Sequence, residues 1–295
     1  MDRVQWADLS KRIRHAVKAI GPTPRAQYSD VLILSIYCWE VANDRPLCWG
    51  CKRENYGGIF RPRTLPSVSQ FCRRVKTSRF QAMLQHLHDQ LTNDSRLSQV
   101  NFLDGKPLPV GNYSRDPEAR NGFGAGQFMR GYKLHVLVRD DRRIASWSIM
   151  PMNVHEMNVA RVIVDQLPHV PRGSMIMADG NYDSHVLHKD VFRRNAWLWL
   201  KPRGMAEHPV TLRQMGPARR ELLRAWRDDP TGSERLNYYR VHVEGTFSNL
   251  TCYSGGLGPL PAFVRRLERV RRWVGAKIIL YHIRLEHRKA NASLN

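Results

Sequence analysis

Cysteine, acidic side chains and long apolar segments are all scarce in this chain of 295 residues. Five cysteines are few and odd in number, which argues against a disulfide scaffold and favours a reducing cytoplasm. An apolar run at residues 31–39 is nine residues long, whereas a bilayer span needs about 20. The chain opens without a basic segment followed by an apolar one, so we expect neither secretion nor membrane insertion.

What the chain has in excess is positive charge. Lysine and arginine number 47 against 26 aspartates and glutamates, a formal net charge of +21. A folded protein of this charge typically has a polyanionic partner, most commonly nucleic acid, although a merely basic protein of the ribosomal type has the same composition. Hydrophobic residues at 42% suffice for a packed core, and the length suggests about two domains.

Residues 1–95 have helical character, with no alternating strand pattern. Asp30 is a candidate cap for a helix over residues 31–41, and residues 67–75 and 78–91 fit two short helices joined by a tight turn. That pair is compatible with a helix-turn-helix contact to DNA, as it is with any basic helical pair. The region from 55 to 88 contains no acid and six basic residues, Arg61, Arg63, Arg73, Arg74, Lys76 and Arg79.

The pattern changes near residue 98. Short apolar or alternating runs predict a mixed sheet in an α/β domain, with helices between the later strands. A glycine-rich stretch at 111–131 reads as a loop. The predicted strands are residues 99–104, 132–139, 144–150, 174–179 and 196–201.

After Pro202 the chain is helical again. Tyr239, Val243, Phe247 and Leu250 form one stripe of a helix that also carries Arg240 and Glu244 four residues apart. A final helix has an apolar stripe from 263 to 285, and we interpret its basic faces as a DNA-backbone contact. Those faces carry Arg265, Arg266, Arg269, Arg271 and Arg272.

Two carboxylates stand at the ends of predicted strands. Asp104 and Asp179 each close an apolar run, and carboxylates at strand ends in an α/β sheet face the crevice where ligands bind. If the strands are neighbours, a hard cation such as Mg²⁺ would relieve the repulsion, and Glu244 could supply a third ligand. The residues alone leave other roles open, since both aspartates precede glycine in possible turns and Glu244 could simply pair with Arg240.

At these positions the sequence resembles a known family. The segments LDGKPLPV around Asp104, MADGNYDS around Asp179 and YYRVHVEGTF around Glu244 resemble the signature blocks of insertion-sequence DDE transposases of the IS4/IS5 type. The segments at 131–138 and 152–158 also resemble family segments, and the likeness covers roughly residues 66–285. In the family's helix motif, Arg240 and Glu244 match, whereas Asn237 occupies the tyrosine position and Thr251 the lysine position.

The resemblance implies an RNase H-like mixed five-stranded sheet flanked by helices, with a helical N-terminal region and a basic C-terminal helix. We expect a DNA-binding or dimerisation region at 1–95, a catalytic domain at 96–255 and the basic helix at 256–295. Asp104, Asp179 and Glu244 would be catalytic and would hold two Mg²⁺ or Mn²⁺ ions. Arg240 and Lys133 would contact phosphate or support the site.

The implied function is DNA transposition: binding of the terminal inverted repeats, metal-dependent hydrolysis and strand transfer into target DNA. We expect double-stranded DNA as the partner, a homodimer on DNA, no membrane, and a bacterial, nucleoid-associated cytoplasmic location. Two alternatives stay open: a DNA-binding regulator or catalytically silent domesticated transposase, and an RNase H-like nuclease without strand transfer.

For several other residues, a structural role is at least as consistent with the sequence as a catalytic or binding role. Lys133 and His135 lie on the polar side of their strand, where solvent or DNA phosphate could meet them. His155 and Glu156 suit helix capping or packing, and Asp183 suits a cap for the next helix. Cys38, Cys48, Cys51 and Cys72 could together hold zinc, but ordinary core cysteines are the favoured interpretation.

Overall fold

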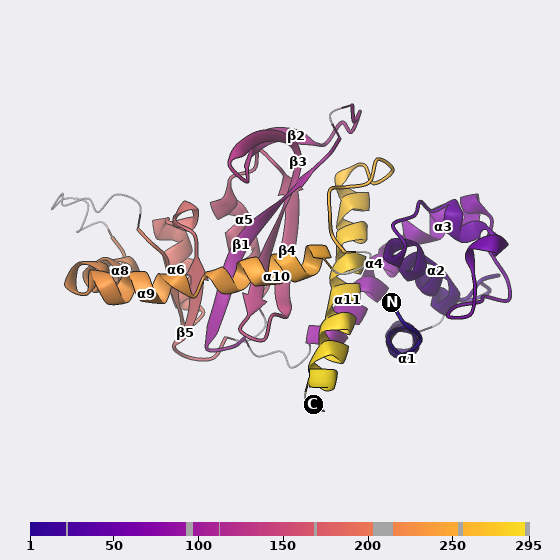
Figure 1. The fold of residues 1–295 in the computed structure, drawn as a ribbon, viewed down its shortest axis with the longest axis horizontal. Coiled ribbons are helices and arrows are strands. Elements are labelled where there is room, and N and C mark those ends of the chain that lie inside the picture. The colour runs from indigo at the N-terminus through magenta and orange to yellow at the C-terminus, as the bar shows by residue number, and fades with distance from the viewer. Residues whose placement is uncertain are drawn as a thin grey trace. The chain divides into compact units, whose positions relative to one another are not determined.

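The computed structural model describes residues 1–21, 23–92, 97–111, 113–167, 170–202, 215–252 and 256–292. It divides into two compact units, one formed by Met1–Asn93 with Asn249–Asn295 and the other by Asp94–Ser248 (Figure 1). The expected boundaries after residues 95 and 255, like Pro22, lie outside the described residues. Among the helices in the described ranges, none is long and apolar enough to cross a membrane.

The first unit is helical, as predicted. Its N-terminal helices begin at side-chain caps: Asp2 forms a capping box with Gln5, and the Ser29 hydroxyl accepts from the Leu32 amide. The expected cap at Asp30 was wrong by one residue, since Asp30 is the first residue of its helix. The elements are α1 (Arg3–Ile20), α2 (Asp30–Ala42), η1 (Trp49–Cys51), η2 (Arg53–Asn55), α3 (Val68–Val75), α4 (Ser78–Thr92) and α11 (Leu267–Ala292).

The two short helices predicted at 67–75 and 78–91 are confirmed as α3 and α4, with Ser67 capping the first. Helix α11 packs against α1, α2 and α4 and is buried along most of its length from Val270 to Leu285. It begins later than the predicted apolar stripe, so Phe263 precedes it. The predicted basic C-terminal helix is thus confirmed as α11, which is the central helix of this unit.

The second unit is built on a mixed sheet. Its strands follow the order β4-β3-β1-β5-β6, antiparallel on the β4-β3-β1 side and parallel from β1 to β6, with the short β2 paired to the start of β3. The predicted mixed five-stranded sheet is therefore confirmed, with β2 as a sixth strand. The strands are β1 (Val100–Pro109), β2 (Arg120–Gly124), β3 (Gln127–Arg139), β4 (Ile144–Pro151), β5 (Ser174–Ala178) and β6 (Ala196–Trp199).

Two expectations for the first strands were wrong. β1 does not end at Asp104 but continues to Pro109, because its antiparallel ladder with β3 extends past the aspartate. The glycine-rich stretch is not wholly a loop, since β2 and the start of β3 form a hairpin within it. Ala125 and Gly126 join them with φ of 49° and 77°, the left-handed pair that a two-residue hairpin turn requires.

Helices cover both faces of the sheet. Leu103 faces a core shared with α5 (Glu156–Asp165) and α6 (His185–Arg193), where Ile163, Ile176 and Leu187 are fully buried. Alternation along a strand places Phe102 and Asp104 on the opposite face, where α10 (Val241–Cys252) crosses β1 (Figure 1). The remaining elements are η3 (Gly180–Tyr182), α8 (Pro217–Asp228) and α9 (Pro230–Tyr238).

Candidate active site

Asp104 and Asp179 occupy equivalent positions on adjacent parallel strands. The β1–β5 ladder pairs residues that are 75 apart, ending at Leu103 with Ala178, and the two aspartates are the next residues of each strand. Asp179 keeps an extended backbone, with φ −72° and ψ 155°. Residues at one register position of neighbouring strands point to the same face, so the two carboxylates are neighbours on the α10 side. The two strands are therefore neighbours, which is the condition on which the expected metal site depended.

The electrostatics of this pair agree with its geometry. The pKa of Asp104 is raised to about 6, chiefly by burial and also by the negative charges of Asp179 and Glu156, against the opposing effects of the Gly105 amide and Arg240. The Gly105 N–H donates to Asp104 Oδ1 at 2.7 Å. A partly buried carboxylate beside a second carboxylate is stabilised in its ionised form when a cation binds between them.

Arg240 reaches this pair from the junction of α9 and α10. Its Nη1 lies 3.5 Å from Asp104 Oδ2. Two residues later, in the first turn of α10, the ring of His242 stacks on Phe102, with centroids 5.0 Å apart. The predicted continuous stripe from Tyr239 was wrong, because α9 ends at Tyr238 and α10 begins at Val241, which leaves Tyr239 exposed.

Glu244 lies in the first turn of α10, four residues after Arg240, and its side chain is exposed. It is therefore on the helix that crosses Asp104, but no described contact joins it to either aspartate. Within the described ranges, no three His, Cys, Asp or Glu side chains converge closely enough to hold a metal ion. The roles of Asp104, Asp179 and Glu244 as metal ligands stay predictions.

The aspartate pair by itself fits a magnesium ion. Mg²⁺ is usually held by one or two carboxylates together with waters and phosphate oxygens. Asp104 and Asp179 provide the carboxylates of that donor set, and the raised pKa of Asp104 reflects its burial beside a second carboxylate.

A polar cluster lies beneath the pair on the other face of the sheet. Lys133 donates to Glu156 at 2.6 Å and to the Phe123 carbonyl at 3.1 Å, and His135 Nδ1 lies 3.0 Å from the Tyr182 hydroxyl. Both strand residues are buried, so the expected solvent-facing side was wrong: helix α5 covers it. Burial, with the nearby Lys133 charge, lowers the pKa of His135 to about 3, so the ring is neutral.

Sequence reasoning undervalued Glu156 and passed over Tyr182. Burial raises the pKa of Tyr182 well above its usual range, and Asp104, Glu156 and Asp179 raise it further. The signal for Glu156 was its position at the start of α5, directly after the cap His155, whose Nδ1 accepts from the Met157 amide at 3.4 Å. The signal for Tyr182 was its place three residues after Asp179.

Asp183, expected to cap α6, does not do so. Ser184 is the cap, accepting from the Leu187 amide at 3.1 Å, while the buried Asp183 accepts two hydrogen bonds of 2.8 Å from Arg219. This bidentate pair ties α8 to the loop after Asp179. The cysteines also have local roles: Cys38 is buried, and Cys51 Sγ donates to the Leu47 carbonyl at 3.6 Å.

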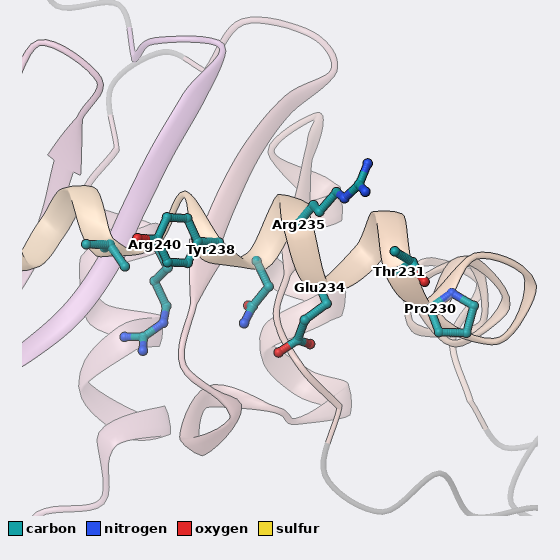
Figure 2. A pocket seen from close by; sticks show the side chains of 8 residues that line it. Pro230, Thr231, Glu234, Arg235, Tyr238 and Arg240 are labelled. Carbon is teal, nitrogen blue, oxygen red and sulfur yellow. The ribbon is translucent and has the colours of Figure 1, made fainter.

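A groove of about 690 Å³ lies along α9 and ends at Arg240 and Val241 (Figure 2). Tyr238, 74% exposed, and Arg235 project from the same helix. Its lining combines cations, an exposed aromatic ring and amide groups beside the carboxylate pair. The lining residues are Pro230, Thr231, Glu234, Arg235, Asn237, Tyr238, Arg240 and Val241.

The basic residues predicted to bind DNA fall into two groups. Arg74 and Arg79 form ion pairs with Asp30, which is buried, so their guanidinium groups hold α2, α3 and α4 together. Arg269 donates to the Phe263 carbonyl at 2.8 Å, Arg271 pairs with Glu268, and Arg272 is buried. The exposed members are Arg61, Arg63, Arg73, Lys76, Arg265 and Arg266.

Comparison with known proteins bears on this arrangement. The family model described as "Transposase DDE domain" matches residues 95–281. The structure is similar to a piggyBac transposase in a synaptic complex with hairpin DNA, determined by cryo-electron microscopy, with a TM-score of 0.52 and 9% identity over 97% of this chain and 74% of that one. At that identity the likeness concerns the fold. Among curated proteins, none matches the chain.

Proposed function

The chain belongs to the DDE transposase family, and we propose that it cuts the ends of an insertion sequence and joins them to target DNA. The observation that carries this proposal is the pairing of Asp104 and Asp179 across the end of a parallel ladder, beside Arg240 at the α9–α10 junction and under α10, which bears Glu244. Binding alone has no use for two adjacent half-buried carboxylates, since their repulsion only costs stability.

We assign the metal-holding role to Asp104, Asp179 and Glu244, with two Mg²⁺ or Mn²⁺ ions. When bound there, divalent cations supply Lewis acidity toward the scissile phosphate and neutralise charge on the attacking and leaving oxygens. The protein's part is to hold the three carboxylates ionised and facing one side. In this proposal the exposed side chain of Glu244 turns toward the aspartate pair, and it is supported by α10, which carries Glu244 and crosses β1 beside Asp104.

Arg240 has two partners in this proposal. In the absence of DNA its guanidinium partly neutralises Asp104 at 3.5 Å. With DNA bound, the same planar group turns to a phosphate oxygen, for which its two-pronged geometry is suited. Lys133, buried and paired with Glu156 at 2.6 Å, supports the strand beneath the site rather than contacting DNA.

The groove along α9 is the route we assign to DNA leaving the aspartate pair. Arg235 and Arg240 offer phosphate contacts and the exposed ring of Tyr238 offers a stacking surface (Figure 2). The net charge of +21 supports a long, salt-sensitive DNA contact. Joining two element ends requires that both be held together, so we propose a homodimer on DNA.

The test is incubation of the full chain with labelled DNA carrying its element's end, in Mg²⁺, Mn²⁺ or EDTA, resolved on a denaturing gel. We expect cleavage at the element boundary only with metal, and joined products when a target plasmid is added. Asp104→Asn, Asp179→Asn and Glu244→Gln each abolish cleavage and retain binding, while Asp228→Asn, an exposed acid on α8, cleaves normally. Metal-dependent cutting without joined products would reassign the chain as a nuclease, and binding without cutting in any metal would leave a DNA-binding regulator.

A further inference from the structure

A second, smaller cavity lies wholly within the helical unit. It measures about 250 Å³ and is enclosed by α2, the turn after α2, the end of α3 and the segment leading into α11. Cavity walls include the rings of Tyr37, Phe263 and Trp273, the last two in edge contact with centroids 5.4 Å apart. This cavity belongs to a different unit from the aspartate pair and has no part in the chemistry assigned above.

The feature that demands a ligand is Arg272. The residue is only 8% exposed and lines the cavity, yet its guanidinium makes no hydrogen bond or ion pair with any residue in the described part of the chain. Buried arginines are normally paired, because an uncompensated charge away from water is costly. In the same unit, Arg74 and Arg79 are paired with the buried Asp30, whereas Arg272 has no such partner among the described residues.

The surroundings of Arg272 favour an anion. Arg45 and Lys76, both exposed, line the same cavity, and neither side chain has a partner among the described residues. Glu40, the acid in the wall, accepts from the Gly50 amide at 3.2 Å. Burial raises the pKa of Glu40 well above its usual range, which disfavours the negative charge that would repel an anion.

The size of the cavity limits what it can take. At about 30 Å³ per water, 250 Å³ holds about eight waters, enough for one phosphate group with part of its sugar and far too little for a duplex. Lys76, which lines the cavity, caps the end of α3 three residues after the exposed Arg73, and both lie within the acid-free stretch of the chain. A backbone phosphate of DNA passing along α3 is therefore the occupant that size and charge select.

We propose that this cavity binds a single DNA backbone phosphate, with Arg272 as its buried donor and Arg45 and Lys76 closing over it. The proposal rests on the proposed function in that it takes DNA as the ligand, and it assigns the contact to a built pocket rather than to the surface of a basic helix. It also separates Arg272 from the other arginines near the start of α11, which are exposed or hydrogen-bonded locally.

The first experiment compares Arg272→Gln with Arg288→Gln, a matched loss of one charge from the exposed end of α11. Affinity for end DNA is measured by fluorescence anisotropy without divalent metal, from 0.05 to about 0.3 M salt. A lost phosphate contact lowers the slope of log K against log salt by about 0.9, and a lost charge-assisted hydrogen bond weakens binding about tenfold. We expect both changes for Arg272→Gln and neither for Arg288→Gln. Equal slopes for wild type and Arg272→Gln would overturn the proposal.

A second measurement locates the phosphate. End DNAs carrying one neutral methylphosphonate at successive positions are tested on both proteins. One position should weaken binding by wild type and have no further effect on Arg272→Gln, because the two changes remove the same contact. Identical position profiles for the two proteins would overturn the proposal.

If circular dichroism shows that Arg272→Gln does not fold, the proposal is tested on the wild-type protein by measuring how fast Cys48 is alkylated. Cys48 lines the cavity and is exposed, so its alkylation by a maleimide reports whether the opening is covered. End DNA should slow the reaction. Protection by inorganic phosphate with none from DNA would overturn the proposal in favour of a free anion. Wild-type protein that fails to bind DNA at all would instead contradict the proposed function.

Discussion

Replacing Asp104 by asparagine is predicted to stabilise the metal-free protein. Burial and the neighbouring Asp179 raise the pKa of Asp104 to about 6, from a value near 3.8 in the unfolded chain. As the pH rises, Asp104 therefore ionises first in the unfolded state, and the free energy of unfolding falls between about pH 4 and pH 6. Below pH 4 both states are protonated and the penalty is absent; above pH 6 it is complete.

The size of the effect follows from the shift. About two pKa units correspond to roughly 3 kcal/mol at 1.36 kcal/mol per unit, an upper figure because the side chain is 20% exposed and the variant also loses its contact with Arg240. We expect a net gain of about 1–2 kcal/mol. For a unit of this size that raises Tm by about 2–8 °C.

The assay is thermal unfolding in EDTA at pH 4.5 and pH 8, followed by circular dichroism. Asp104→Asn should melt higher than wild type at pH 8, with a smaller difference at pH 4.5, and Mn²⁺ should stabilise wild type more than the variant. The control Asp228→Asn removes an exposed acid and should change neither melt. A variant that melts at or below the wild-type temperature at pH 8 would refute the reasoning, since Asp104 would then not be carrying an ionisation penalty.

Three further outcomes are expected. Burial acts to raise the pKa of Asp30, but hydrogen bonds from Thr23, Arg79 and Arg74 hold that pKa below its usual value. The ionised carboxylate therefore stabilises the fold above about pH 4, and this contribution is lost as the pH falls further. Asp30→Asn should lower the free energy of unfolding in urea by about 3–5 kcal/mol at pH 7 and by less at pH 3. Arg240→Gln removes the cation that lowers the pKa of Asp104, so the acid limb of the cleavage-rate profile should move to higher pH, whereas Arg240→Lys should leave it in place. Ala125→Asn should stabilise the β2–β3 hairpin by about 0.5 kcal/mol in the same urea assay, because Ala125 holds a left-handed φ of 49° that asparagine tolerates better.

Local pattern was enough for the elements with strong periodicity. Residues 174–179 were predicted as a buried strand from a continuous apolar run, and β5 spans Ser174–Ala178; the helices α3 and α4 were predicted at 67–75 and 78–91. The hairpin at β2 was missed because glycine-rich segments carry little strand propensity, and its pairing to β3 depends on the 125–126 turn. The break before Val241 was missed because the stripe through Tyr239 keeps helical spacing on both sides of it.

The sequence pointed to the two aspartates of the candidate site but not to the buried polar contacts beneath them. Asp104 and Asp179 are adjacent because their separation of 75 residues equals the register offset of β1 and β5, a quantity that only strand pairing defines. The Lys133–Glu156 and His135–Tyr182 contacts join residues 23 and 47 apart, and nothing local marks them as partners. Alternation along the strand correctly placed Lys133 and His135 on one face of β3. It could not show that helix α5 covers this face and buries both side chains.

The two proposed anion contacts differ in how the charge of the arginine is compensated when DNA is absent. Arg240 lies over a carboxylate at 3.5 Å, so without DNA its charge is already compensated and it can exchange Asp104 for a phosphate as a cation takes its place. Arg272 has no such partner among the described residues, so its burial is relieved only by a ligand. DNA binding should therefore stabilise the helical unit even in EDTA, and Arg272→Gln should raise the stability of the DNA-free protein while removing that gain. A variant less stable than wild type without DNA would mean that Arg272 is compensated within the unit.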